Sequence, residues 1–307
     1  QLPDVSYASG YDLLANPGRS FAPTEALLEA LEIPGYELLA PLGGGGMGDV
    51  YLARRSADEK EVAIKTIRPV YRPSEEEAQR FLREAQILCA LQHPNIVAFH
   101  QLGRTDERLY IVMEYVAGND AGKLIKFQGP MGVGRSVRLI LQTLDALEYA
   151  HRRGYVHRDV KPSNLLVSGA GSSELCQLAD FGLARVYYES RMSGLTLLGT
   201  AGGSVQFMAP EQVTNFRGVG AAADQYGAAA TLYYLCTAGH LFPTDDNQEG
   251  RFKNILTAQP IPIQQQRPDI PEGLARVIHR ALSKEISDRF LDVKTFRAAL
   301  EPFQNGP

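Results

Sequence analysis

The sequence predicts an α+β fold of two unlike lobes, a small antiparallel β-sheet lobe with one helix and then a larger, mainly helical lobe. Strand-like runs rich in Val, Ile and Tyr fill residues 36–116, whereas apolar side chains recur at helical spacing beyond Gly118. Strands that precede helices along a chain are typical of α+β proteins. The length of 307 residues, 44% of them hydrophobic, is enough for one large domain or two lobes.

The strands of the small lobe are predicted by short runs that Gly or charged turns separate. They cover residues 36–40, 49–53, 61–67, 97–101 and 109–116. Runs of this length and number predict an antiparallel sheet of about five strands.

One helix is expected between the third and fourth of these strands. Ser74 precedes Glu77 in a capping-box pattern, and acidic side chains follow Ser74 directly, where the positive end of the helix dipole favours them. In the large lobe, helices are expected around 137–147, 221–238, 272–283 and 291–301. Residues 1–34 contain one short helical candidate at 24–32, and the sequence does not indicate its role.

Composition excludes several classes of function. Lys and Arg total 31 against 35 Asp and Glu, so the net charge of −4 provides no broad basic surface for nucleic acid or anionic lipid. Three cysteines without a C-x-x-C pair indicate neither a disulfide framework nor a zinc site, which favours a reducing, cytoplasmic setting. The most apolar stretch, 221–239, contains Asp224 and Gln225, so we expect no membrane contact by this chain. The chain starts at Gln1 without Met, and we expect it to be part of a longer protein that can include a membrane anchor.

A glycine-rich segment, LGGGGMGDVY at 42–51, contains the pattern G-x-G-x-x-G-x-V. Glycines between two strands let the backbone lie close over a polyphosphate, because no Cβ blocks the approach. Taken alone, the pattern is more often a flexible hairpin, and the P-loop pattern is absent because no Lys follows these glycines directly.

Lys65 ends the run VAIK in the third strand, and an unpaired ammonium in an apolar strand is costly to bury. One explanation is a surface lysine on an edge strand. The other is a partner on the predicted helix, Glu84, which would let the ammonium hold nucleotide phosphates.

Three further motifs follow in order: HRDVKPSN at 157–164, DFG at 180–182 and APE at 209–211. With the glycine-rich segment, these residues make the chain resemble protein kinases of the Ser/Thr class over roughly 36–300, and in particular the bacterial eukaryotic-like kinases. The resemblance implies the two-lobed protein-kinase fold, with an extension at 1–34, a small lobe at 35–117 and a large lobe at 118–302. It implies transfer of the γ-phosphate of ATP, with Mg²⁺ or Mn²⁺, to Ser or Thr hydroxyls of proteins.

The resemblance also assigns roles at the site of transfer. Asp159 would accept the proton of the substrate hydroxyl, Lys161 would contact the γ-phosphate, and Asn164 and Asp180 would hold the metal ions. Lys65, paired with Glu84, would position the phosphates. A lysine at position 161 is typical of Ser/Thr rather than Tyr kinases.

The resemblance also implies which residues form the nucleotide pocket. Met113 would guard the back, the Glu114 carbonyl and Val116 amide would bind adenine, Asp120 would reach the ribose, and Val50, Ala63 and Leu166 would enclose the ring. The full expected set is Leu42, Gly43, Gly45, Gly48, Val50, Ala63, Lys65, Met113, Glu114, Val116, Asp120 and Leu166.

Other positions match structural and regulatory parts of the family. Asp224 would fix the HRD backbone, although Tyr226 stands where the family usually has Trp, and Arg289 would pair with Glu211. Leu88, Phe99, His157 and Phe181 match the column of side chains that links the lobes.

The loop between DFG and APE is expected to carry regulation. Arg158 would receive a phosphate from it, with Ser193, Thr196 and Thr200 as the candidates for autophosphorylation. Ser204 stands where the family usually has Thr, in a Gly-Thr pair whose hydroxyl bridges the catalytic Asp and Lys.

Two alternatives to an active kinase stay open. A pseudokinase or scaffold would bind nucleotide without transferring phosphate, and a small-molecule kinase would use the same core on another acceptor. As partners we expect protein substrates and a homodimer through the small lobe, but no nucleic acid.

Overall fold

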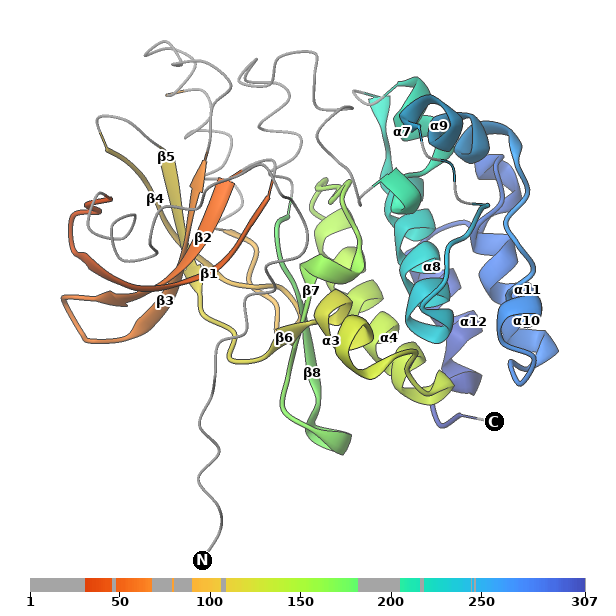
Figure 1. Cartoon of the computed structure of the whole chain (residues 1–307), viewed down its shortest axis with the longest axis horizontal. Coiled ribbons are helices and arrows are strands. Elements are labelled where there is room, and N and C mark those ends of the chain that lie inside the picture. The colour runs from red at the N-terminus through yellow and green to blue at the C-terminus, as the bar shows by residue number, and fades with distance from the viewer. Residues whose placement is uncertain are drawn as a thin grey trace, which may run out of the picture.

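A computed structural model describes residues 31–45, 48–67, 79, 90–105, 109–181, 205–215, 218–243, 245 and 247–306. Its strands are β1 (Tyr36–Gly45), β2 (Gly48–Arg55), β3 (Glu61–Ile67), β4 (Phe99–Arg104), β5 (Leu109–Glu114), β6 (Asn119–Asp120), β7 (Leu165–Ser168) and β8 (Leu175–Leu178). Its α-helices are α3 (Ala121–Gln128), α4 (Val133–His151), α7 (Pro210–Thr214), α8 (Ala221–Thr237), α9 (Gln248–Thr257), α10 (Ile263–Gln266), α11 (Glu272–Ala281) and α12 (Val293–Leu300). Figure 1 shows the strands β1 to β5 on one side and the helices on the other, with β6 to β8 between them. The predicted two-lobed fold, with a five-stranded antiparallel sheet and a mainly helical lobe, is confirmed.

The small lobe is an antiparallel sheet with the strand order β1-β2-β3-β5-β4. β1 runs to Gly45, past the predicted end at residue 40, because the glycine-rich segment continues the hairpin and Gly45 pairs with Gly48. β4 begins two residues later than predicted, because the Val97 amide donates to the Leu178 carbonyl of β8 at 3.1 Å. The backbone at this point therefore joins the sheet of the small lobe to the strands between the lobes.

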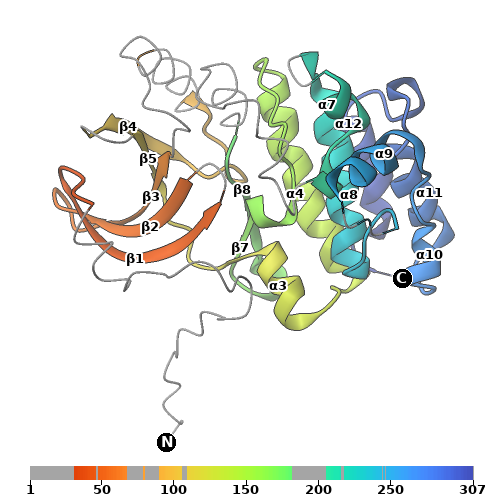
Figure 2. The same cartoon turned by 45° about the horizontal axis from the view of Figure 1, so that its top comes forward.

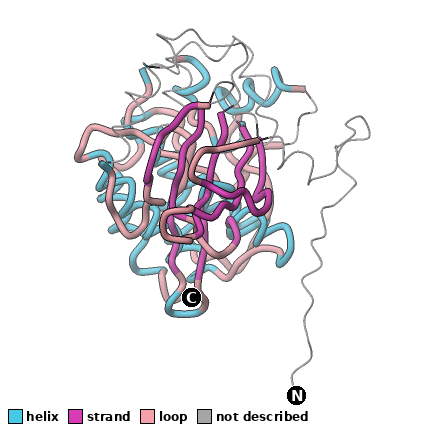
Figure 3. The backbone as a smooth tube through the Cα atoms, turned by 90° about the vertical axis from the view of Figure 1, so that its left-hand side faces the viewer, coloured by secondary structure: helices cyan, strands magenta, loops and turns pink. Residues whose placement is uncertain are grey.

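The sheet curls, so its two edge strands are linked through one face. The Tyr36 hydroxyl of β1 donates to the Gln101 side chain of β4 at 2.9 Å, although three strands separate β1 from β4 in the sheet. Beneath this link lies a separate apolar cluster that includes Ile33, Ile64 and Val112, each at most 3% exposed. Figure 3 looks onto the strands, with helices behind them.

The large lobe is built around α8, which is buried on all sides. Its residues Ala228, Leu232 and Tyr233 are fully buried, and a helix that is apolar all round belongs in the centre of a domain. The helices α4, α11 and α12 pack against it (Figure 2). α12 begins at Val293, two residues after the predicted start, because Asp292 caps it by accepting the Thr295 amide hydrogen at 2.7 Å.

Three short strands, in the order β6-β7-β8, join the lobes. The sequence did not predict them, because strands of two to four residues carry no readable alternation. The chain enters β6 through Gly118, where an added Cβ would lie 2.1 Å from the Val167 carbonyl oxygen, so only glycine allows this approach.

Within the described ranges, no helix has the length and apolar character needed to cross a membrane. The predicted helix at 24–32 and the helix predicted after Ser74 fall in parts of the chain outside the described residues, apart from Leu31, Glu32 and Gln79.

Candidate active site

Lys65 lies in the middle of β3 with only 6% of its surface exposed. Its Nζ is 2.5 Å from Oδ2 of Asp180, which follows β8. Burial raises the pKa of the Asp180 carboxyl, but the charge of Lys65 and its hydrogen bond outweigh burial, so the pKa is lowered overall. The lysine that sequence analysis marked as needing a partner therefore has one in Asp180. Glu84, the partner expected from sequence, lies outside the described residues.

The segment 157–164 places a second set of polar groups beside this pair. Oδ2 of Asp159 is 2.7 Å from Nζ of Lys161. The Asn164 side-chain amide donates to the Asp159 carbonyl at 2.8 Å and to its Oδ2 at 3.2 Å. The Ala179 amide donates to the Asn164 carbonyl at 2.8 Å, which fixes the segment next to Asp180.

The buried carboxylate of Asp224 supports the backbone of the segment 157–164. Asp224, 1% exposed, accepts the His157 amide at Oδ2 (2.8 Å) and the Arg158 amide at Oδ1 (2.7 Å). Arg158 has a φ of 68°, a left-handed conformation that costs a non-glycine residue about 1–3 kcal/mol and needs such support. Asp224 thus sets the backbone that presents Asp159.

Two supporting residues were missed by sequence analysis. Nε2 of His151, the last residue of α4, lies 2.7 Å from Oδ2 of Asp224. The Gln212 side chain donates to the Arg158 carbonyl at 2.7 Å and accepts the Ala209 amide at 3.0 Å. Neither position carries a pattern that a single sequence can reveal, although Gln212 directly follows the APE motif.

Glu211, the last residue of the APE motif, forms an ion pair with Arg289. The fully buried Arg289 side chain binds Glu211 through both terminal nitrogens, at 2.7 and 2.8 Å, and donates to three backbone carbonyls. This bidentate geometry fixes α7 against α8. The Tyr226 ring lies 5.1 Å from the Arg289 guanidinium carbon.

The apolar residues expected to enclose adenine belong to, or pack against, the main apolar core, which runs from the small lobe into the large lobe. Ala63 and Met113 are opposite each other on β3 and β5, and both are 6% exposed. The other apolar members pack against the same cluster: Leu42, Val50, Val116 and Leu166. Phe99 and Phe181 also belong to it, and the rings of His157 and Phe181 lie 4.6 Å apart.

The polar residues of the expected pocket already have partners. Asp120 caps α3 by accepting the Lys123 amide at 2.9 Å, and its Oδ2 is 3.5 Å from Nζ of Lys123. The Glu114 carboxylate accepts a hydrogen bond from the Gln177 side chain at 3.0 Å. A ribose hydroxyl at Asp120 would therefore compete with Lys123.

The glycine-rich segment forms the β1–β2 hairpin. Gly43 pairs with Val50, and Gly45 with Gly48. Gly48 has a φ of 150°, and a Cβ there would lie 1.7 Å from the Thr66 carbonyl oxygen, so a side chain is excluded. Gly46 and Met47 lie outside the described residues, as do Leu88, Ser193, Thr196, Thr200 and Ser204.

A curled sheet, a helical lobe and a Lys65–Asp180 pair between them define the two-lobed class of kinase folds. The chain belongs to the protein kinase domain family, whose sequence pattern matches residues 36–298.

Curated relatives of the chain include bacterial Ser/Thr kinases, to which it is homologous over most of its length. It is 36% identical over 273 residues to serine/threonine-protein kinase pkn3 of Myxococcus xanthus, covering 87% of this chain and 49% of the relative. It is 36% identical over 277 residues to PknF of Mycobacterium tuberculosis, covering 89% and 57%. The chain thus spans about half the length of these relatives.

Among solved structures, the kinase domain of Mycobacterium tuberculosis PknI matches with a TM-score of 0.68 at 30% identity. The match covers 89% of this chain and 97% of the PknI domain.

Proposed function

We propose that the protein is an active Ser/Thr protein kinase, which transfers the γ-phosphate of ATP to hydroxyl groups of protein substrates. The observation that carries this proposal is the convergence of Lys65, Asp180, Asp159, Lys161 and Asn164 in one site between the lobes. The Lys, Asp and Asn side chains whose loss would mark a pseudokinase are all present, and each contacts another polar side chain of the site.

Phosphoryl transfer needs positioning and charge neutralisation more than covalent chemistry. Asp159 orients the acceptor hydroxyl and takes its proton, while the γ-phosphoryl group passes from ATP to the hydroxyl oxygen. Lys161, already next to Asp159, provides a positive charge where the transferred oxygens become most negative. Lys65 moves from its contact with Asp180 towards the phosphates, which frees a carboxylate oxygen of Asp180.

The donor set fits a magnesium or manganese ion. Asn164 uses its amide nitrogen on Asp159, which leaves its carbonyl oxygen as a ligand, and Asp180 supplies a carboxylate. Such ions prefer oxygen ligands and take only one or two from protein when phosphates supply the others. Held by Asn164 and Asp180, a bound ion would supply positive charge that neutralises the phosphates.

The test is transfer of labelled phosphate from ATP to a generic basic protein. Asp159→Asn should lower the rate by at least ~100-fold, because no base then accepts the hydroxyl proton. Nucleotide binding should persist in this variant, because Lys65 and the apolar walls are intact. Equal background rates for both proteins, with nucleotide still bound, would instead favour the pseudokinase or scaffold.

Regulation by autophosphorylation is part of the proposal. Arg158 is anchored next to Asp159, where a phosphate on Ser193, Thr196 or Thr200 would find a cation. Phosphopeptide mapping after incubation with ATP and Mg²⁺ should find a modified residue within 186–204. An unmodified segment in an active preparation would remove this part of the proposal.

We also propose a cytoplasmic setting and a homodimer through the small lobe. ATP is available in the cytoplasm, and Cys176 and Cys236 are buried free thiols, which fits a reducing compartment.

Sedimentation of the chain at increasing concentration tests the proposed homodimer. A monomer at every concentration would exclude the dimer for this chain.

A further inference from the structure

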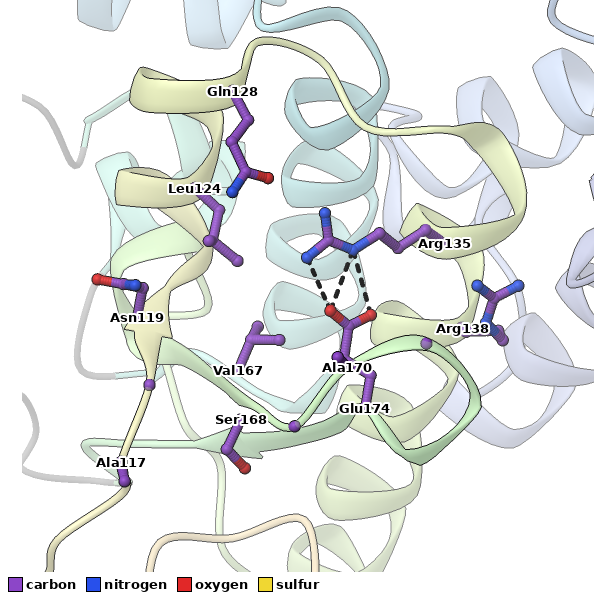
Figure 4. A pocket seen from close by; sticks show the side chains of 13 residues that line it. Ala117, Asn119, Leu124, Gln128, Arg135, Arg138, Val167, Ser168, Ala170 and Glu174 are labelled. Carbon is purple, nitrogen blue, oxygen red and sulfur yellow. Dashed lines mark hydrogen bonds and ion pairs between the residues drawn. The ribbon is translucent and has the colours of Figure 1, made fainter. Parts of the chain in front are cut away.

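Two pockets of the large lobe each contain a polar contact between side chains that line them. In the pocket between α3, α4 and the turn after β7, Arg135 and Glu174 face each other at 2.7 Å (Figure 4). None of the residues assigned to phosphate transfer lines that pocket. The other pocket, of about 240 Å³, lies between the short turn Val205–Phe207, the connection from α8 to α9, and α9 itself. There Nδ1 of His240 lies 2.5 Å from Oε1 of Gln206.

The turn Val205–Phe207 lies next to the segment that carries the expected catalytic base. A Cβ added to Gly227 of α8 would lie 2.9 Å from the Val160 carbonyl oxygen and 3.6 Å from the Phe207 carbonyl oxygen. The two backbones therefore meet on one face of α8, and Val160 directly follows Asp159. A protein whose hydroxyl group reaches Asp159 would accordingly border this turn.

The turn rests on the core through its first and last side chains. Val205 is 3% exposed, and the Phe207 ring meets the Tyr234 ring of α8 edge-on, with centroids 5.8 Å apart. Gln206, between them, lines the pocket and reaches His240. An exposed hydrogen bond usually contributes little, but a segment that borders a pocket has few packing contacts to replace one. Packing on α8 thus leaves the pocket side of the turn to be fixed by this bond.

The backbone that presents His240 is itself held on two sides. The Gln266 side chain of α10 donates to the His240 carbonyl at 2.9 Å. Gly239 leaves room for this side chain, since an added Cβ would lie 1.9 Å from its Oε1. The Leu241 carbonyl accepts the Ile261 amide at 2.8 Å. The imidazole therefore extends from a fixed backbone and can position the turn rather than follow it.

The chemistry of the contact identifies its donor. Oε1 of Gln206 can only accept a hydrogen, so Nδ1 of His240 carries one. An asparagine at position 240 would place an amide N–H close to where Nδ1 lies, whereas an alanine would remove the donor. A conservative replacement can thus keep the bond while a truncation breaks it.

We propose that His240 is a positioning residue for the acceptor protein: through Gln206 it fixes the turn beside the acceptor site and so strengthens acceptor binding. It takes no part in phosphate transfer itself. This role rests on the proposed kinase function. ATP is expected to bind between the lobes, so its affinity should not depend on His240.

The test is steady-state transfer of labelled phosphate to the generic basic protein, with acceptor and ATP concentrations varied separately. His240→Ala should raise the KM for the acceptor by about three- to tenfold, as expected for one hydrogen bond. Both kcat and the KM for ATP should stay within about twofold. His240→Asn should restore the parental acceptor KM. An unchanged acceptor KM in His240→Ala, or the same rise in His240→Asn, would overturn the proposal.

A double-mutant cycle shows whether His240 acts through Gln206. Gln206→Ala should raise the acceptor KM, and adding His240→Ala should raise it little further, because the two residues share one contact. Strictly additive effects would overturn the proposal.

Glu174→Ala is the matched control, since it removes the polar contact in the other pocket of this lobe (Figure 4). It should leave the acceptor KM unchanged. A rise equal to that of His240→Ala would mean that any loosening of the large lobe has this effect, and the specific role of His240 would fall. The thermal midpoint of each variant verifies that it is folded.

Hydrogen exchange of the chain without ATP separates this role from the proposed function. The Met208 amide closes the turn by donating to the Val205 carbonyl at 3.1 Å. It should exchange faster in His240→Ala than in the parent, but not in His240→Asn. A protein that shows this difference and transfers no phosphate would contradict the proposed function and leave the link from His240 to the turn standing. Unchanged exchange in His240→Ala would overturn the proposal even for an active kinase.

Discussion

The ammonium of Lys65 and the carboxylate of Asp180 lie 2.5 Å apart and neutralise each other inside the site. Lys65→Met should leave a largely buried carboxylate without its counterion, at a cost of about 3 kcal/mol of unfolding free energy at pH 7. Phosphate transfer should also fall by at least ~100-fold.

The pH dependence of this variant has a definite sign. In the parent the pKa of Asp180 is below its ordinary value, so its contribution to stability is present above the unfolded pKa, and is lost as pH falls through the folded pKa. In Lys65→Met burial dominates and raises the pKa, so the variant should instead gain stability as pH falls towards 5. Thermal unfolding at pH 5 to 8 checks this, and parallel curves for both proteins would contradict it.

Gly48 and Gly43 belong to the same glycine-rich segment but differ in their surroundings. Gly48→Ala forces a side chain against the Thr66 carbonyl at a φ of 150° and should destabilise the protein by about 1–3 kcal/mol. A Cβ at Gly43 meets nothing within 4 Å, so Gly43→Ala should change stability by less than about 0.5 kcal/mol. Urea unfolding of both variants is the measurement, and equal effects would refute the geometric explanation.

Tyr226 stands where the family usually has Trp, and its buried hydroxyl finds no hydrogen-bond partner among the described residues. Burial also raises the pKa of this tyrosine, so its hydroxyl stays protonated and still needs an acceptor. Tyr226→Phe should therefore stabilise the protein by about 1 kcal/mol.

Tyr233 on the same helix provides the matched control. Its hydroxyl donates to the Ile261 carbonyl at 3.0 Å, so Tyr233→Phe should destabilise by about 1 kcal/mol. Thermal unfolding midpoints of both variants check this. If both midpoints fall, the Tyr226 hydroxyl has a hydrogen-bond partner after all.

Arg289 and Glu211 form a bidentate pair whose arginine is fully buried. Arg289→Ala should cost about 3–5 kcal/mol, because Glu211 loses its counterion and three carbonyls lose a donor. In the double variant with Glu211→Ala, part of this loss should be recovered. A double-mutant cycle measures the coupling, and strictly additive losses would mean that the pair contributes little as a pair.

Sequence alone predicted the two-lobed fold and the residues that the structure brings together around Asp159 and Lys65. These residues sit in contiguous motifs, and an apolar strand that contains one lysine already signals an unusual need for a partner. The actual neighbour of Lys65, Asp180, is 115 positions away, so no local pattern links the two. His151 and Gln212 escaped prediction for the same reason, because their partners, the Asp224 carboxylate and the Arg158 carbonyl, approach them only after folding. The strand β6 escaped because two residues have no periodicity.

Asp224 receives three donors on one buried carboxylate: two backbone amides and the ring of His151. The conformational entropy lost in ordering the peptide around Asp159 is therefore offset while the helical lobe folds, by groups that no substrate touches. Asp159 is therefore already oriented before a nucleotide or an acceptor binds. The binding energy of these ligands is not needed to order this base. Damage to α8 far from the cleft would accordingly appear first as a loss of turnover, even where nucleotide affinity is retained.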